Sequence, residues 1–255
     1  MRVIGFIGTG TISAAVIEGL QSLPHAPEVV VSPRSEAVSR SLAGRFAKVR
    51  RAQSNAEVAK ADIVFLGMRP MHLDDAMAGI EFGEGQIVAS MVAGFSLADI
   101  QARWPRATVC RVIPMPGAAR RKGPITTYPR VPEIVELMAP LGDLFVVSEE
   151  SKLGFGGLNA FMSSYFELQR ALIDVGTGAG LPEADARRFV VSLLGMMADT
   201  AEHTPAEAFG KLVEEHQTKG GLNERVRAHL LAEGWFDRPR AALNATTTLG
   251  YKTLG

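Results

Sequence analysis

The sequence predicts an α/β protein, with a Rossmann-type parallel sheet domain followed by an all-helical domain. Two observations predict it: short β-branched runs alternate with amphipathic stretches up to about residue 147, and the strand signals then stop. We place the boundary so that the sheet domain covers 1–148 and the helical domain covers 149–255. A mild charge difference between the two halves supports this division.

The strands are predicted from apolar runs that end at turn signals. The runs end at Ile7, Val31, Leu66, Ser90 and Val112. Most are followed by an amphipathic stretch, which is the pattern of βαβ units and therefore of a parallel sheet. Shorter runs at 125–127 and 145–147 can extend that sheet.

The helices of the second half are predicted at 155–178, 182–201, 204–215, 222–233 and 238–253. Thr204 and Pro205 are interpreted as a helix start, because Glu207 stands at the capping-box position. Wide apolar stripes run through the first two helices, for example at Phe161 and Phe189. A small helical domain often buries such stripes against a second subunit.

Composition and charge narrow the function classes. The 255 residues carry 27 Lys+Arg and 27 Asp+Glu, so the net charge of zero argues against nucleic acid or a polybasic membrane surface as partner. The one cysteine, Cys110, excludes an internal disulfide, and the five histidines show no metal-ligand spacing. No apolar run is long enough to span a membrane. We expect a cytoplasmic protein without a metal.

The glycine turn after the first strand is the most informative stretch. In the segment 4–13, Gly8 permits a tight turn, and Gly10 lacks a Cβ, so a pyrophosphate can approach the backbone. The helix that follows offers N–H groups at Thr11 and Ile12. Ser13 stands where the dinucleotide fingerprint has Gly or Ala. A structural turn without a ligand is the alternative, but the position after a first strand favours a dinucleotide.

The end of the second strand indicates which cofactor binds. NAD sites usually place a carboxylate there for the ribose 2′-OH, whereas this chain has Ser32, Pro33 and Arg34. A guanidinium beside a hydroxyl suits a 2′-phosphate. We therefore predict NADP (NADPH), with NAD as a possible second cofactor. The alternative is that Arg34 is a solvated residue of the next helix.

Ordered motifs through most of the chain resemble the pyrroline-5-carboxylate reductase family. Similar segments are 5–10, 62–70, 92–94, 111–114, 171–174, 180–182 and the glycines at 220 and 221. The resemblance implies an oxidoreductase that reduces a cyclic imine carboxylate to proline with a nicotinamide cofactor, in proline (amino-acid) biosynthesis. It also implies an intertwined homodimer or a higher homo-oligomer, with the site between the cofactor domain and a partner's helices.

The same resemblance extends the set of cofactor-binding residues beyond the glycine turn. We expect the dinucleotide to contact Gly8, Thr9, Gly10, Thr11, Ile12, Ser32, Pro33, Arg34, Asn55, Met68, Arg69, Pro70, Ala93, Gly94 and Pro114. Arg69 replaces a lysine of the family. Asn55 starts a short helix, and capping that helix explains it equally well.

The substrate half departs from the family's pattern, which suggests a divergent relative. Thr218, Lys219, Gly220 and Gly221 are the candidate substrate-binding residues, because two glycines before a helix can converge N–H groups on a carboxylate. An ordinary turn between helices is the alternative. Asn223 replaces the family's threonine near the imine nitrogen and is the candidate catalytic residue. It can orient the substrate, or it can merely cap the helix.

Four functions remain open. The first is pyrroline-5-carboxylate reduction, and the second is NADPH-dependent reduction of another imine or a carbonyl. The third, a hydroxyacid dehydrogenase, needs a lysine on the long helix, and 156–170 contains none. The fourth is a non-catalytic NADP sensor, which the altered substrate loop keeps open.

Overall fold

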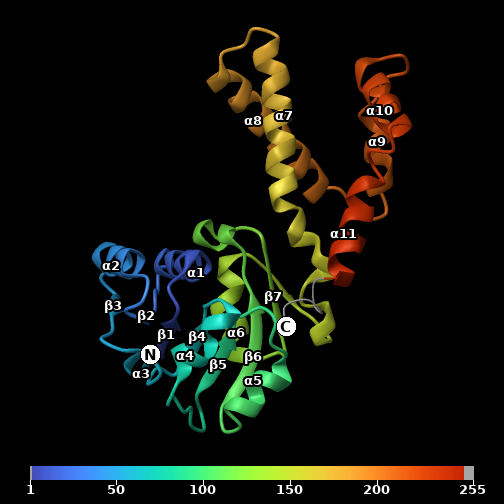
Figure 1. Cartoon of the computed structure of the whole chain (residues 1–255). Helices are drawn as coiled ribbons and strands as arrows, with labels where there is room; N and C mark the ends of the chain where they lie inside the picture. The colour runs from blue at the N-terminus through green and yellow to red at the C-terminus, as the bar shows by residue number, and fades with distance from the viewer. Residues whose placement is uncertain (1, 250–255) are drawn as a thin grey trace. The chain divides into compact units, whose positions relative to one another are not determined.

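The computed structural model describes residues 2–249, and these divide into two units between Phe155 and Gly156. The first unit is the predicted α/β domain and the second is entirely helical, so the predicted fold class is confirmed (Figure 1). The first unit ends at Phe155, seven residues after the predicted boundary at 148. No described helix is long and apolar enough to cross a membrane.

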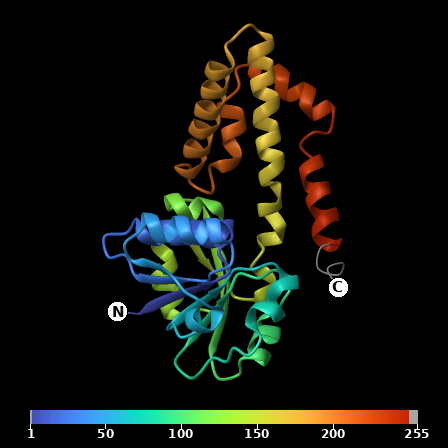
Figure 2. The same cartoon turned by 60° about the vertical axis from the view of Figure 1, so that its left-hand side comes forward.

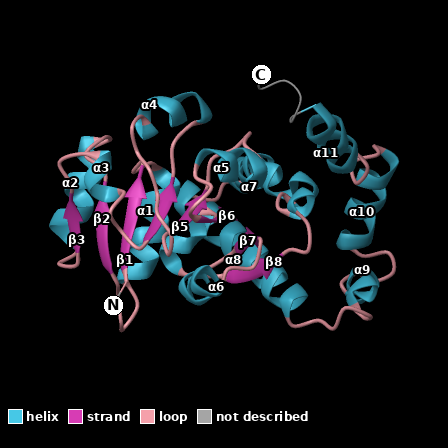
Figure 3. Ribbon diagram, turned by 90° about the horizontal axis from the view of Figure 1, so that it is seen from below, coloured by secondary structure: helices cyan, strands magenta, loops and turns pink. Residues whose placement is uncertain are grey.

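The first unit is built on one eight-stranded sheet. Its order is β3-β2-β1-β4-β5-β6-β7-β8, and the first six of these strands run parallel (Figure 3). The strands are β1 (Val3–Ile7), β2 (Glu28–Val31), β3 (Val49–Arg51), β4 (Ile63–Leu66), β5 (Ile87–Ser90), β6 (Thr108–Ile113), β7 (Pro124–Tyr128) and β8 (Asp143–Val146). The order reverses direction at β1, and ligands of such sheets bind at that switch point, beyond the carboxyl ends of the strands.

Two of the strands differ from the expectation. β3 was missed because it is three residues long and carries two arginines, Arg50 and Arg51. β7 and β8 do extend the sheet, but β7 runs antiparallel to β6. The sheet is therefore mixed at this edge.

Apolar side chains cover both faces of the sheet. Val16 and Leu20 of α1 pack on one face, and Leu73 and Ile100 pack on the other. The helices of this unit are α1 (Thr11–Gln21), α2 (Glu36–Arg45), α3 (Asn55–Val58), α4 (Leu73–Met77), α5 (Leu97–Arg103) and α6 (Pro132–Met138). Short 3₁₀ turns are η1 (Pro70–His72), η2 (Pro116–Arg120), η3 (Ala139–Leu141) and η4 (Glu150–Lys152). A parallel sheet covered on both faces explains why its strands are continuous apolar runs.

The helical unit begins with a 3₁₀ turn and a pair of antiparallel helices. Its elements are η5 (Phe155–Phe161), α7 (Met162–Gly178), α8 (Glu183–Glu202), η6 (Phe209–Lys211), α9 (Leu212–Glu215), α10 (Leu222–Ala232) and α11 (Arg238–Leu249). Helices α7 and α8 lie side by side (Figure 2), and a Cβ added to Gly176 would lie 3.0 Å from the Cβ of Ala186. The predicted helix 238–253 extends beyond the described residues at its end.

The predicted helix 204–215 is wrong in its first half. Residues 204–208 form a bend and turns, and regular helix begins at Leu212. The hydroxyl of Thr204 donates to the carbonyl of Thr200, 2.7 Å away, so it bonds to the helix before it instead of capping a new one.

Candidate dinucleotide site

The glycine turn lies at the carboxyl end of β1 and leads straight into α1. Gly8 adopts φ +93°, and a Cβ there would meet the carbonyl oxygen of Gly67 at 2.6 Å. Gly10 is different, because its φ is −80° and an added Cβ would find its nearest atom only 3.9 Å away. Gly8 is therefore required by the fold, whereas the bare backbone of Gly10 faces open space.

The N-terminus of α1 is open. No side chain caps it, and no acidic residue stands in its first turn. An uncapped helix start presents N–H groups and the positive end of the helix dipole, which together suit a pyrophosphate. The absence of a competing carboxylate at this end is what such a ligand needs.

Hydrogen bonds fasten the glycine turn to the loop after β2. The Gly8 N–H donates to Ser32 Oγ at 3.0 Å, and Thr9 Oγ1 donates to the carbonyl of Arg34 at 2.7 Å. Ser32 and Thr9 are fully buried. Their hydroxyls therefore hold the two loops together. Ser32 was expected to help bind a 2′-phosphate, but its hydroxyl already accepts the Gly8 N–H.

The end of β2 presents a different hydroxyl beside Arg34. Ser35 is exposed, adopts φ +60°, and lines the same pocket as Arg34. Arg51 of β3 supports this loop, since its Nη2 donates to the carbonyl of Pro33 at 3.0 Å and its Nε to Ser39 Oγ at 3.1 Å. Arg34 and Ser35 together thus offer a guanidinium and a hydroxyl at the end of β2.

One carboxylate, Glu36, stands next to this pair. Its side chain accepts from Arg40, 2.7 Å away, and that bond, with the charges of Arg40 and Arg51, lowers the pKa of the Glu36 carboxyl below its usual value. Glu36 therefore stays ionised, and two arginines offset its repulsion toward a phosphate.

A pocket of about 330 Å³ connects these features. It is lined by a subset of the predicted cofactor residues, namely Gly8, Thr9, Gly10, Ser32, Arg34, Asn55, Met68 and Arg69. The other predicted residues lie outside its lining, and they are Thr11, Ile12, Pro33, Pro70, Ala93, Gly94 and Pro114. Two residues of this second group, Pro70 and Gly94, lie close together, since a Cβ on Gly94 would be 4.0 Å from the Cγ of Pro70.

Some lining residues were not identified from the sequence. Ser35, Gly67, His72 and Ala76 also line the pocket. Gly67 could have been found, because it directly follows β4, at the same edge of the sheet as Gly8. His72 carried no signal, since a lone histidine in a helical turn is usually an ordinary surface residue.

Asn55 serves the pocket and the fold together. Its Nδ2 donates to the carbonyl of Ala76, 2.9 Å away, and so ties α3 to the end of α4. The cap of α3 is Ser54, whose hydroxyl accepts from the N–H of Glu57. Capping thus falls to Ser54, and Asn55 is left as part of the pocket wall.

The predicted substrate loop lies in the helical unit, before α10. Gly221 donates its N–H to the carbonyl of Thr218 at 2.7 Å, and Gly220, at φ +74°, donates its N–H to the carboxylate of Glu224. Both N–H groups of the expected carboxylate nest are therefore already bonded within the chain. Glu224 was not identified from the sequence.

The candidate catalytic amide is also engaged. Asn223 Nδ2 donates to the carbonyl of His216 at 2.8 Å, across the loop. Thr218 and Lys219 are exposed. Asn223 therefore braces the loop from the first turn of α10. Among the described residues, no group of three or more acidic, histidine or cysteine side chains is arranged to hold a metal ion.

Comparison with known proteins finds oxidoreductases. Residues 3–94 match the family model described as NADP oxidoreductase coenzyme F420-dependent. A pyrroline-5-carboxylate reductase of Synechocystis sp. is 27% identical, over 98% of each chain. Among solved structures, a 1-pyrroline-5-carboxylate reductase from Streptococcus pyogenes superposes with a TM-score of 0.84 at 20% identity, over 98% of each chain. One from Plasmodium falciparum with NADP bound has the same TM-score at 13% identity, over 98% of this chain and 97% of that one.

The fold, the glycine turn and the matched family model define an NAD(P)H-dependent oxidoreductase. Within that class, pyrroline-5-carboxylate reductases are similar to this chain over nearly its full length, at 27–28% identity.

Proposed function

We propose that this protein uses NADPH to reduce the C=N bond of pyrroline-5-carboxylate, giving proline. The use of a dinucleotide is supported above all by Gly10, which precedes a helix whose N-terminus is uncapped. The protein itself has room for a Cβ at Gly10, but that Cβ would fill the space that a pyrophosphate needs. The choice of substrate is supported by the relatives, which are named pyrroline-5-carboxylate reductases and match this chain over nearly its full length.

The preference for NADPH rests on the end of β2. Arg34 and Ser35 provide a guanidinium and a hydroxyl, the groups that suit a 2′-phosphate, and Glu36 is held by Arg40. The NADP named in the Plasmodium falciparum structure agrees with this choice.

In this reaction the chain's own residues bind and orient the cofactor and the imine, while a bound dihydronicotinamide would supply the hydride. Gly10 and the start of α1 would hold the pyrophosphate, and Arg34 the 2′-phosphate. In the helical unit, the substrate carboxylate would take the N–H of Gly220 in place of Glu224. Asn223 would then orient the imine through the free side of its amide, and water would supply the proton, since an amide is a poor acid.

Glu224 favours a second candidate, an imine without a carboxylate. Its carboxylate already occupies the N–H of Gly220, so an anionic substrate must displace it and is repelled by it. A neutral or cationic imine meets neither obstacle. This second function keeps the cofactor site and changes only the substrate.

A second copy of the chain is the partner that we infer, as a homodimer or a larger homo-oligomer. The support is the helical unit, where Phe166 and Phe189 are 64% and 65% exposed. Such large apolar side chains are typical of a surface that is covered in an assembly. We expect this assembly to act in the cytoplasm, in amino-acid biosynthesis.

The experiment that tests the function is NADPH oxidation followed by absorbance. The substrates are pyrroline-5-carboxylate and, as a matched imine without the carboxylate, 1-pyrroline, each with NADPH and with NADH. Turnover of the carboxylate supports the first function. Turnover of 1-pyrroline alone supports the second. Tight NADPH binding without turnover of either contradicts both and leaves a sensor.

An Arg34→Ala variant tests the cofactor preference. We expect NADPH to bind roughly tenfold or more weakly, because a charge-assisted bond to phosphate is lost, while NADH changes little. Titration by fluorescence gives both dissociation constants. Arg45→Ala is the control, since Arg45 ends α2 and pairs with Glu18. Equal weakening of both cofactors would contradict the assignment.

A further inference from the structure

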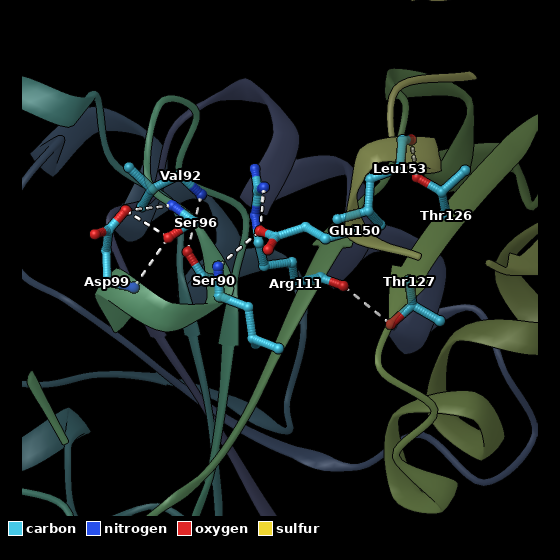
Figure 4. Close-up of polar contacts among 10 residues, drawn as sticks. Ser90, Val92, Ser96, Asp99, Arg111, Thr126, Thr127, Glu150 and Leu153 are labelled. Atoms are coloured by element: carbon cyan, nitrogen blue, oxygen red, sulfur yellow. Dashed lines mark hydrogen bonds and ion pairs between the residues drawn. The ribbon is translucent and has the colours of Figure 1, made fainter. Parts of the chain in front are cut away.

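A buried arginine on β6 has no part in the pocket described above. Arg111 is 8% exposed and lies in register with Ser90 of β5 and Tyr128 of β7. Its Nη1 donates to Glu150 Oε1 at 2.8 Å (Figure 4), and its Nε is buried without a hydrogen-bond partner. A buried arginine that keeps an unpaired donor, and whose partner Glu150 is only half-buried, is a poor source of stability, because an apolar residue of similar volume often serves as well. Its presence therefore calls for a role other than stability.

The same carboxylate holds the start of α5. Glu150 Oε1 also accepts the N–H of Leu97 at 2.6 Å, so one oxygen joins β6 to the first residue of that helix. Glu150 lies 53 residues further along the chain, in the segment that leads into the helical unit. The end of the loop before α5 is thus fixed by a tertiary contact, in addition to the local capping box of Ser96 and Asp99.

The loop held in this way is 91–96, between β5 and α5. At its other end the N–H of Val92 donates to Ser90 Oγ at 3.3 Å, and Gly94 adopts φ +80° (Figure 4 shows Ser90 and Val92). The loop follows the carboxyl end of a parallel strand, the edge where ligands of such sheets bind. Gly94 stands beside Pro70, which directly follows the pocket residue Arg69.

We propose that Glu150 and Arg111 are positioning residues that set loop 91–96 against the nicotinamide end of the cofactor. The proposal rests on the function proposed above and on the expectation from the sequence that the dinucleotide contacts Ala93 and Gly94. Neither side chain touches the reacting atoms. Arg111 holds the Glu150 carboxylate, and that carboxylate holds the N–H of Leu97 at the end of the loop. A small displacement of the loop would change the distance over which hydride moves.

The kinetic test compares Glu150→Ala with Glu149→Ala. Glu149 is the neighbouring carboxylate, and it pairs on the surface with Lys152. For Glu150→Ala we expect kcat to fall about tenfold to a hundredfold, the effect of a small misplacement, with the NADPH dissociation constant and the KM for the imine within about threefold of wild type. Glu149→Ala should match the wild type. Glu150→Gln keeps an acceptor oxygen for Leu97 and should recover part of kcat.

A second readout does not depend on turnover. Hydrogen exchange should be faster over 91–97 in Glu150→Ala than in Glu149→Ala. The affinity gained on going from 2′-phospho-ADP-ribose, which lacks nicotinamide, to NADPH should also shrink in Glu150→Ala alone, by about twofold to threefold, which agrees with the small change expected in the NADPH dissociation constant. An unchanged kcat in Glu150→Ala overturns the proposal, even if its melting temperature falls. If the wild type reduces no imine, the proposed function fails, and an unchanged affinity gain then overturns the positioning role as well.

Discussion

The two units of this protein treat their apolar side chains in opposite ways. The sheet unit encloses phenylalanines such as Phe6 and Phe65 between its strands and helices. In the helical unit, Ala186 and Val190 are the buried residues among those whose side chains the structure describes. The sheet unit therefore has a core of its own, whereas the helical unit leaves many of its large apolar side chains exposed. The motifs expected to bind the cofactor, which resemble the family's pattern more closely than the substrate loop does, lie in the sheet unit.

The largest effect is expected from a charge on the apolar surface of the helical unit. Phe189→Glu should abolish the proposed homodimer, because a carboxylate would be buried without a counter-charge in that assembly. Most of the turnover should be lost with it. Light scattering after size-exclusion chromatography gives the oligomeric state, and NADPH oxidation gives the activity.

Arg188→Glu is the matched control for that variant. Arg188 is an exposed charged residue on the same helix, α8, and one step along a helix turns a side chain about 100° away from Phe189, so the same carboxylate should leave assembly and activity unchanged. NADPH binding in the sheet unit should survive in both variants. A Phe189→Glu protein that stays dimeric would show that this surface is not the interface.

A pair of glycine variants sharpens the comparison inside the sheet unit. Gly10→Ala should fold like the wild type, since its Cβ meets nothing closer than 3.9 Å, but should bind NADPH roughly tenfold to a hundredfold more weakly. Gly8→Ala should instead lose stability, by about 1–3 kcal/mol from the backbone conformation and more from the contact with Gly67. Thermal melting and cofactor titration separate the two effects. Normal NADPH affinity in Gly10→Ala would contradict the site.

The smallest effect is expected in the pH dependence of stability, through Asp99. Hydrogen bonds from Ser96, its hydroxyl first and its N–H second, lower the pKa of the Asp99 carboxyl, and Arg103 and Arg111 add to this. A depressed pKa contributes stability above the unfolded value, near 3.8, that is lost as the pH falls through the folded value. Asp99→Asn should therefore lower the melting temperature by a few degrees at pH 6 and by progressively less toward pH 3. A difference that stays constant with pH would exclude this origin.

The sequence predicted the fold well where a segment is long and its pattern continuous. The buried strands ending at Ile7 and Leu66 were recognised because both of their faces are covered, which makes every residue apolar. β3 was missed because an edge strand with two arginines has no such pattern. The helix start at Thr204 was wrong because a threonine hydroxyl can bond backward to the preceding helix as readily as it caps the next one.

The candidate site was predictable only to the extent that its chemistry is local. Gly8 and Gly10 identify themselves, since strand, turn and helix follow one another in the chain. Ser35 and Ser32 look alike in sequence, and only the fold shows that Ser32 is buried against Gly8. Glu224 follows the substrate-loop glycines closely, yet its bond to Gly220 depends on the turn those residues adopt. The partners of Arg111 lie too far along the chain for any spacing rule.

The serine at the third position of the glycine fingerprint makes a neighbouring position dependent on it. Ser13 Oγ donates to the Gly8 carbonyl at 2.6 Å, and a Cβ on Gly67 would lie 2.2 Å from Ser13 Oγ. Alanine at 67 can therefore be accepted only after the hydroxyl at 13 is gone. In evolution the serine at 13 must therefore be replaced before the glycine at 67. A sequence pattern that requires Gly or Ala at the third position does not include this dependence between the two residues.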